Sequence, residues 1–245
     1  VRNKYYKYHD YDRFPVDLSI SVGDRYLADN GALFRGEHNP YVNLFMEYGN
    51  PFNDSENKPY DFFYAEATFG FSANQPLING LHILGRIWGA PVYENNNIQA
   101  EFGIFQHFNY YDSKPVKDGT SLTPYRISEA ASFGPGMIFS FPQVGALTRL
   151  EQRVFLSAIL LGGTKSDYYN VIDRDYNMGS GFSIKTKTHM EFRDFGRFIL
   201  HTEYYRIFTW KGYEDKDLTK VDPLYLNAQG DKGNASLLVI NPIWE

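Results

Sequence analysis

The stretch NMGSGFSIKTKTHMEFR, at residues 177–193, alternates between two kinds of side chain at every second position. One face carries Met178, Phe182, Ile184 and other apolar or threonine side chains. The opposite face is polar and rich in glycine; its members are Asn177, Gly179, Gly181, Ser183, Lys185, Lys187, His189, Glu191 and Arg193. A period of two is typical of a β-strand, because an amphipathic helix repeats every 3.6 residues. The stretch therefore predicts a single strand, much longer than the usual length of about five or six residues.

The same alternation recurs along the chain. It is clear at residues 16–23, 42–49, 62–72 and 98–105, and further strands are expected near 80–92, 126–141, 148–162, 196–210 and 235–244. No segment has the pattern of an amphipathic helix, and no break in composition divides the chain. We therefore predict an all-β protein in which residues 1–245 form one domain.

The lengths of the connections indicate how the strands are joined. Tight turns are expected at residues 94–97, 142–146 and 193–196, and they alternate with long polar loops at 112–124, 163–175 and 211–234. In an up-and-down barrel, alternate connections emerge at opposite ends. Short turns at one end and long loops at the other are typical of outer-membrane barrels. The connection at 50–60 departs from this rule, because it should be short and is not.

Composition excludes several other classes of protein. The chain has 20 Tyr, 20 Phe and 3 Trp residues and no cysteine, and its mean hydropathy is −0.44. Disordered chains contain few aromatic residues, so this composition argues against disorder. The absence of cysteine rules out a disulfide scaffold, a thiolate metal site and a cysteine nucleophile. A membrane-spanning helix needs about 20 consecutive apolar residues, and no stretch of this sequence is that long. The net charge of −5 without a basic block argues against nucleic acid as a partner.

The two faces of the strands distinguish a soluble barrel from a membrane barrel. A soluble sheet buries its apolar face, whereas a transmembrane barrel turns that face to lipid and encloses the polar face. Strand length, glycine among the charged residues and aromatic residues near strand ends favour the second arrangement. The aromatic residues expected in such an interfacial girdle are Tyr41, Tyr60, Tyr93, Tyr110, Tyr111, Tyr168, Tyr169, Tyr204, Tyr205 and Trp210. We predict an antiparallel, transmembrane-type barrel of about 10–12 strands.

Charged residues of the enclosed face should pair across neighbouring strands, because an unpaired charge is costly in a narrow lumen. Centring the turns near residues 76 and 93–94 places Glu66 opposite Arg86, and Arg86 opposite Glu101. We predict a charge network along the lumen wall; its members are Glu66, Arg86, Glu101, Glu151, Arg153, Lys185 and Lys187.

A chemically interesting cluster is expected near the turn at residue 195. That turn places Lys187 opposite Glu203 and His189 opposite His201. A histidine beside a carboxylate can act as a general base, and Ser183 lies on the same face as a candidate nucleophile. Barrel lipases and acyltransferases use such wall sites, but toward the outer rim, whereas this cluster lies near a tight turn. A hydrogen-bonded lumen wall is the simpler interpretation.

Metal binding and cofactor binding are not predicted. His82 and His107 also face the proposed lumen, but no helix-spaced His-Glu-x-x-His pattern supports a metal site. The chain also lacks a phosphate loop and a Gly-x-Ser-x-Gly elbow.

Several segments together resemble an uncharacterised family of outer-membrane β-barrel proteins from Bacteroidota and related Gram-negative bacteria. They are MEYGNPF (46–52), NGLHILGRIW (79–88), GIFQHFNYYD (103–112), DYNMGSGF (175–182), YRIFTWKG (205–212) and NAQGDK (227–232). The resemblance covers most of residues 16–245. It implies a further region before Val1 and no established activity, so we expect the C-terminal portion of a longer protein. The last residues, NPIWE (241–245), have the pattern of a strand that is cut midway, so we expect the sequence to end within its last strand.

Three functions are thus open. The first is a structural, binding or assembly role in the bacterial outer membrane rather than an open porin, with membrane lipid, lipopolysaccharide and other outer-membrane proteins as partners. The second is a lipid-modifying hydrolase or acyltransferase that uses His189, His201, Glu203 and Ser183. The third is a soluble, aromatic-rich β protein that binds carbohydrate.

Overall fold

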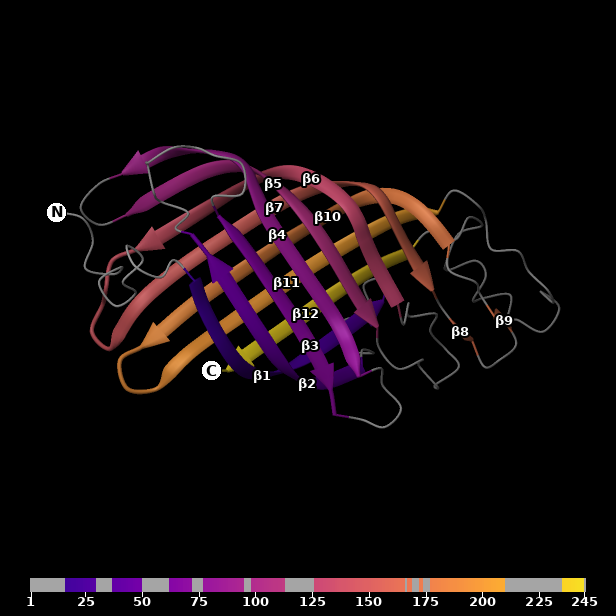
Figure 1. The fold of residues 1–245 in the computed structure, drawn as a ribbon, viewed down its shortest axis with the longest axis horizontal. Helices are drawn as coiled ribbons and strands as arrows, with labels where there is room; N and C mark the ends of the chain where they lie inside the picture. The colour runs from indigo at the N-terminus through magenta and orange to yellow at the C-terminus, as the bar shows by residue number, and fades with distance from the viewer. Residues whose placement is uncertain are drawn as a thin grey trace.

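The described strands form one closed antiparallel barrel in a computed structural model (Figure 1). The structure describes residues 16–29, 37–49, 62–71, 77–94, 98–112, 126–165, 167–168, 172–173, 177–209 and 235–244. The barrel strands are β1 (Val16–Asp29), β2 (Glu37–Tyr48), β3 (Phe63–Gly70), β4 (Ile78–Glu94), β5 (Gln99–Asp112), β6 (Arg126–Phe141), β7 (Leu147–Lys165), β10 (Asn177–Phe192), β11 (Gly196–Thr209) and β12 (Ala235–Trp244). Each strand pairs with its neighbour in sequence, and β1 pairs with β12 to close the ring. The all-β, antiparallel, up-and-down barrel predicted above is confirmed, with ten strands.

Tight turns gather at one end of the barrel, as expected. The turns β6–β7 and β10–β11 lie on the left in Figure 1. Gly145 (φ 60°) and Gly196 (φ 84°) adopt there the left-handed conformation that glycine tolerates best. The predicted loops at 112–124 and 211–234 and the connection at 50–60 lie largely outside the described residues.

The predicted loop at 163–175 needs a correction. Strand β7 continues to Lys165, and β8 (Asp167–Tyr168) pairs with β9 (Ile172–Asp173) in a small hairpin beyond the barrel end. Two-residue strands are too short for a period of two to be detected in the sequence.

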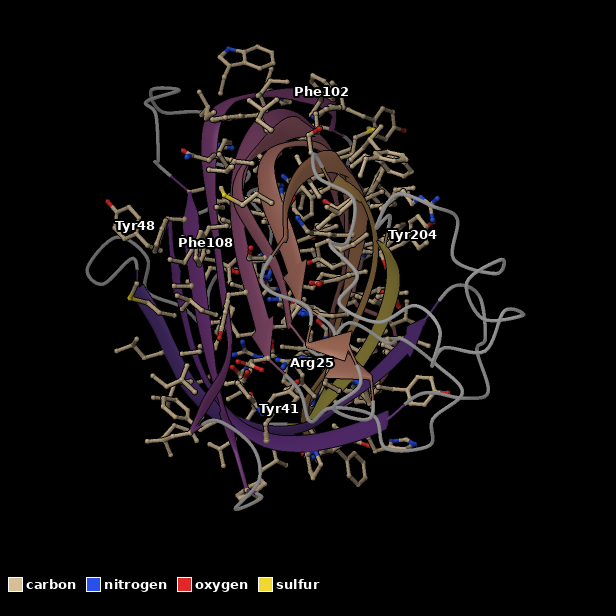
Figure 2. All side chains as sticks on the ribbon, turned by 90° about the vertical axis from the view of Figure 1, so that its right-hand side faces the viewer. Arg25, Tyr41, Tyr48, Phe102, Phe108 and Tyr204 are labelled. Carbon is tan, nitrogen blue, oxygen red and sulfur yellow. The ribbon has the colours of Figure 1, made fainter. Side chains whose placement is uncertain are left out.

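Among the described side chains, the apolar face of the long strands points away from the barrel interior (Figure 2). Leu18 and Ile20 are each 70 % exposed, and the same outward side of other strands carries Phe182 and Ile184. Figure 2 shows Tyr48, Phe102, Phe108 and Tyr204 outside the wall, whereas Arg25 and Tyr41 point inward. This inversion of a soluble sheet is the arrangement predicted from the two faces. It contradicts the interpretation as a soluble protein, which requires the apolar face inside.

The expected aromatic girdle is wrong for three of its members. Tyr41, Tyr111 and Tyr205 are buried inside the barrel rather than at its surface. A tyrosine hydroxyl can form hydrogen bonds inside the lumen as well as at a membrane interface, so a position near a strand end does not decide the side of the wall. Tyr60, Tyr169, Trp210 and the side chain of Tyr168 lie outside the described residues.

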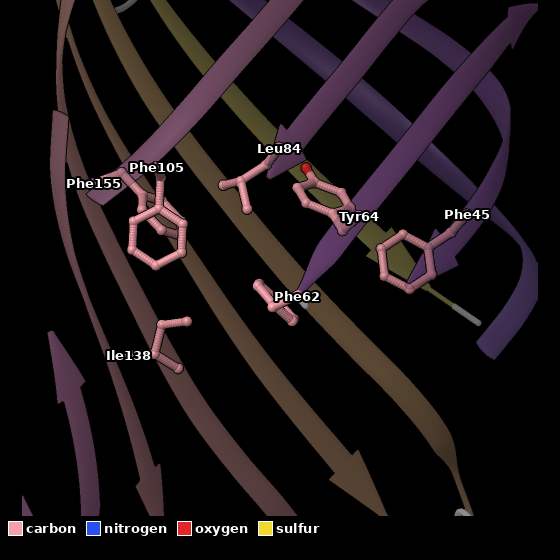
Figure 3. Packing of buried hydrophobic residues seen from close by; sticks show 7 residues of the cluster. All are labelled: Phe45, Phe62, Tyr64, Leu84, Phe105, Ile138 and Phe155. Atoms are coloured by element: carbon pink, nitrogen blue, oxygen red, sulfur yellow. The ribbon is translucent and has the colours of Figure 1, made fainter. Parts of the chain in front are cut away.

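The core of the protein is the barrel lumen. Its largest apolar cluster comes from the six consecutive strands β2–β7 (Figure 3) and consists of Phe45, Phe62, Tyr64, Leu84, Phe105, Ile138 and Phe155. The rings of Phe105 and Phe155 meet edge to face with their centroids 4.9 Å apart. Side chains thus fill this part of the lumen, which agrees with the expectation for a narrow barrel.

Glycines on the inner face make room for large neighbours. A Cβ added at Gly89 would lie 2.7 Å from Cδ of Arg86, and one added at Gly80 would lie 2.7 Å from Nη2 of Arg25. Small residues therefore stand where long side chains cross the narrow interior. Among the described residues, no helix is long and apolar enough to cross a membrane.

Candidate functional site

All candidate residues from the sequence lie buried in the barrel interior. They are Glu66, Arg86, Glu101, Glu151, Arg153, Ser183, Lys185, Lys187, His189, His201 and Glu203. His82 and His107 are buried there as well. The inner face was therefore identified correctly, but several of the predicted pairings are wrong.

The predicted cross-strand pairs of Arg86 with Glu66 and with Glu101 are wrong. In the ladders, Glu66 stands opposite His82, and Arg86 stands opposite Phe105. The pair Glu66↔His82 centres the β3–β4 hairpin about two residues earlier than predicted. The pair Glu94↔Gln99 centres the β4–β5 hairpin about three residues later than predicted, and two β-bulges in β4 offset only part of that difference. The ion pair between Arg86 and Glu101 nevertheless forms, because the arginine side chain runs along β4 past Gly89.

The predicted pairs across β10 and β11 are displaced by two residues. Lys187 stands opposite His201 rather than Glu203, and His189 stands opposite Ile199 rather than His201. The turn is centred on residue 194, one residue earlier than predicted. A shift of one residue at a turn moves each cross-strand partner by two.

The candidate hydrolase residues do not form a catalytic site, because Ser183 is not bonded to a histidine. Ser183 Oγ donates a hydrogen bond to Glu129 Oε1 at 2.9 Å instead of to a histidine. Glu129 Oε2 also accepts from Lys185 Nζ at 2.5 Å and from Asn109 Nδ2 at 2.7 Å. His189 lies six residues farther along the same strand, which corresponds to about 20 Å. Ser183 is thus part of a buried hydrogen-bond network around Glu129.

A second network surrounds Glu203 in the middle of the lumen. Glu203 Oε2 accepts hydrogen bonds from Tyr205 at 2.6 Å and from Tyr111 at 2.8 Å. Its other oxygen, Oε1, lies 3.9 Å from His82 Nδ1, which is also bonded to the hydroxyl of Tyr64. The sequence analysis missed the roles of the three tyrosines; Tyr64 lies on the polar face of residues 62–72, where its alternation could have revealed it.

The third network joins β2 and β7 toward the turn end. Arg153 Nη1 lies 2.8 Å from Glu47 Oε2, and Arg153 also pairs with Glu151. Arg149 Nη2 donates to Glu151 Oε2 at 2.9 Å. Glu47 and Arg149 were not among the predicted members, although Glu47 lies on the polar face of residues 42–49.

Arg25 forms a fourth connection, from β1 to β3 and β4. Its guanidinium donates to Thr68 Oγ1 at 2.9 Å and to the backbone oxygen of Asn79 at 3.0 Å. It also lies 4.2 Å from the ring centre of Tyr111 and 5.0 Å from that of Tyr41. The sequence analysis missed Arg25, which lies just beyond the strand pattern recognised at residues 16–23.

The buried charges of the described interior nearly balance. The cationic side chains are Arg25, Arg86, Arg149, Arg153, Lys185 and Lys187. The carboxylates are Glu47, Glu66, Glu101, Asp112, Glu129, Glu151 and Glu203. Such a balance is expected where charges must neutralise one another away from water.

Buried cationic side chains of β7 and β10 contact aromatic rings of the apolar lumen cluster. Lys187 Nζ lies 4.0 Å from the ring centre of Tyr64 and 4.5 Å from that of Phe45. The guanidinium of Arg153 lies 5.1 Å from the ring centre of Phe62. These cation–π contacts connect β7 and β10 with β2 and β3 across the lumen. Within the described ranges, no group of three or more His, Cys, Asp or Glu side chains is placed to hold a metal ion.

Comparisons with known proteins add little to this picture. No protein-family model matches the chain, and no curated protein matches it. A search of solved structures finds a crystal structure of Ail, the attachment invasion locus protein of Yersinia pestis, in complex with the heparin analogue sucrose octasulfate. That match has 10 % sequence identity and a TM-score of 0.28, and it covers 94 % of this chain and 96 % of that chain. At this level of similarity, the interpretation of the barrel rests on its own residues.

Proposed function

We propose that this chain is a bacterial outer-membrane barrel protein with a sealed lumen, which acts in a structural, binding or assembly role and not as an open porin. The observation that carries the proposal is the inversion of the wall. Apolar side chains face outward on all sides, and the charged side chains are enclosed. A closed barrel of this kind leaves no sheet edge in lipid.

The interior supports a sealed rather than a conducting barrel. Rings from β2–β7 occupy one wall, and cations from β7 and β10 lie directly on them. Porins that keep an aqueous channel are wider, with about 16–18 strands. The outward face then provides the binding surface, with membrane lipid, lipopolysaccharide and other outer-membrane proteins as the proposed partners.

The resemblance to the Bacteroidota-type family of outer-membrane barrels agrees with this proposal, and we infer from it a Gram-negative bacterium as the source. No geometry favours the lipid-modifying enzyme, because Ser183 and the two histidines of β10 and β11 are not joined by a hydrogen bond. We therefore propose no catalytic residue.

Reconstitution into lipid vesicles tests the proposal. The folded chain should insert, resist extraction at high pH and migrate faster than its heat-denatured form on a detergent gel. Vesicles that contain it should swell in isotonic sugar no faster than empty vesicles. A soluble monomer without detergent would contradict the membrane assignment, and fast swelling would contradict the sealed lumen.

A variant with Phe105→Ala and Phe155→Ala is the matched positive control. It removes two rings from the lumen cluster and leaves the outer face unchanged. Swelling by this variant alone would show that the assay detects a passage and that the rings close it.

A further inference from the structure

Glu129 of β6 contacts a lysine and an asparagine through the same oxygen atom. Its Oε2 accepts hydrogen bonds from Lys185 Nζ at 2.5 Å and from Asn109 Nδ2 at 2.7 Å. Asn109 stands opposite Glu129 in the ladder between β5 and β6. Lys185 reaches the same oxygen from β10, on the other side of β7. Three strands thus bring an amine, a carboxylate and an amide to one point of the lumen.

These three side chains are removed from bulk water. Glu129 and Asn109 are 0 % exposed, and Lys185 is 2 % exposed. The ring centre of Tyr205 lies 5.6 Å from Lys185 Nζ. An amine and an amide that share one hydrogen-bond acceptor in such a place are held close to each other, and this proximity can replace a large part of a reaction barrier.

The carbonyl oxygen of Asn109 is not used in this arrangement. Asn109 Oδ1 is buried and has no hydrogen-bond partner among the described residues. A buried oxygen without a partner costs stability, and proteins break such rules chiefly where a side chain has a function. The amide group of Asn109 is therefore only half engaged, and its carbonyl carbon is the electrophile next to the lysine.

We propose that Lys185 and Asn109 become joined by an intramolecular amide bond, and that Glu129 transfers the protons. Lys185 first passes a proton to Glu129 along their hydrogen bond, which leaves a neutral amine as the nucleophile. A bond forms between Nζ of Lys185 and Cγ of Asn109, and the bond between Cγ and Nδ2 breaks. Glu129 carries that proton and a second one from Nζ to Nδ2, so the leaving group departs as ammonium and the carboxylate is restored.

The neighbouring lysine of the same strand is not placed for this reaction. Lys187 Nζ lies on the rings of Tyr64 and Phe45 and has no hydrogen-bond partner among the described residues. It therefore has neither a carboxylate to take its proton nor an amide beside it. Lys187 is buried on the same face of β10, so it provides a matched control for Lys185.

The bond ties together two strands that are not neighbours in the barrel. It closes a loop from residue 109 to residue 185 and connects β5 with β10 past β6 and β7. A cross-link restricts the unfolded chain and so stabilises the folded one. The chain has no cysteine, so it cannot form a disulfide. The reaction takes place once in each molecule and acts on no other substrate.

The mass of the intact chain is the first test. After folding in detergent, the unmodified chain should be lighter than its sequence mass by one molecule of ammonia. A chain kept unfolded in urea should retain the sequence mass. Protease digestion of the folded chain should release one branched peptide that joins the segments around Asn109 and Lys185. A folded chain with the full sequence mass would overturn the proposal.

Variants of the two joined residues provide the second test. Lys185→Met and Asn109→Leu should each retain the full mass of their sequence, because each lacks one of the reacting groups. Lys187→Met should still lose one molecule of ammonia. Masses are read only from molecules that migrate as folded barrels on a detergent gel. Loss of ammonia from folded Lys185→Met would place the loss at another residue and contradict the bond.

Shortening the carboxylate side chain tests the part played by Glu129. Glu129→Asp keeps the charge that balances Lys185, so the barrel should still fold, but it draws the carboxylate back from both nitrogen atoms. Ammonia loss during refolding should slow by about a hundredfold, because a misplacement of about 1 Å can cost that much. A rate equal to that of the unmodified chain would show that Glu129 does not transfer the protons.

Discussion

Arg86 and Glu101 form an ion pair inside the barrel although they are not partners in the β4–β5 ladder. Arg86 stands opposite Phe105, and Glu101 stands opposite Pro91. The arginine side chain spans the difference by running along its own strand past Gly89. Pairing in this lumen is therefore decided by side-chain reach as well as by register.

Removal of the carboxylate from this pair should destabilise the barrel. Glu101→Leu leaves the buried Arg86 charge without its main counter-ion, and loss of one partner of a buried pair typically costs about 3 kcal/mol. The double variant Arg86→Leu with Glu101→Leu should recover most of that loss. Urea unfolding in lipid vesicles, followed by the fluorescence of the nearby Trp88, measures both. Equal destabilisation by the single and double variants would show that the pair is not coupled.

Gly89 should tolerate no larger residue. Gly89→Val places a branched side chain where Arg86 and Glu101 meet, and overpacking of this kind typically costs about 1–3 kcal/mol. Ala90→Val, one residue along on the outward face, should be nearly neutral in the same unfolding assay. A neutral Gly89→Val would mean that Arg86 has another path to its partner.

The two neighbouring lysines of β10 should respond in opposite ways. Lys187 Nζ has no hydrogen-bond partner among the described residues and lies on two rings, so Lys187→Met should be neutral or stabilising by about 1 kcal/mol. Lys185 Nζ is bonded to Glu129, and Lys185→Met should destabilise by about 3 kcal/mol because it leaves that carboxylate buried. The comparison uses midpoints of urea unfolding. Similar effects of the two substitutions would show that their partners do not matter.

A charge on the outer face should be costly only at mid-wall. Ile184→Lys places an ammonium group in the outward apolar band and should cost about 2–4 kcal/mol in vesicles. Tyr93→Lys, near the end of β4, should cost about 0–1 kcal/mol, because the interfaces tolerate charge. The unfolding free energies of both variants, compared in vesicles whose bilayers differ in thickness, would reveal the depth of each site. A small, equal cost at both positions would argue against lipid around the wall.

The inward and outward faces could be predicted from the sequence because the period of two is preserved within each strand. Phe182 and Lys185 were assigned correctly to opposite faces, since a strand places alternate residues on opposite sides whatever its partner. Cross-strand partners are different. They depend on where each turn is centred and on bulges. The β4–β5 hairpin is centred about three residues later than expected, so Arg86 faces Phe105 rather than Glu101 although two bulges offset part of the difference.

The networks of the lumen were predictable only in part. Glu47 lay on a face already recognised as polar, but its contact with Arg153 crosses the barrel from β2 to β7 rather than joining neighbouring strands. The distance between opposite walls depends on strand tilt and closure, which a local pattern does not contain. The buried tyrosines show the same limit, because ring composition alone does not distinguish the two sides of the wall.

The apolar lumen cluster has a consequence for the order of assembly. Its members come only from β2–β7, strands that are contiguous in sequence, whereas the charged wall on β10 and β11 needs partners from distant strands. Contacts between near neighbours form with less loss of chain entropy. We expect the curved sheet β2–β7 to fold as a nucleus, on which the lysine-bearing strands then close. Pulse-labelling exchange during refolding should protect Phe105 before Glu203, and simultaneous protection would contradict this order.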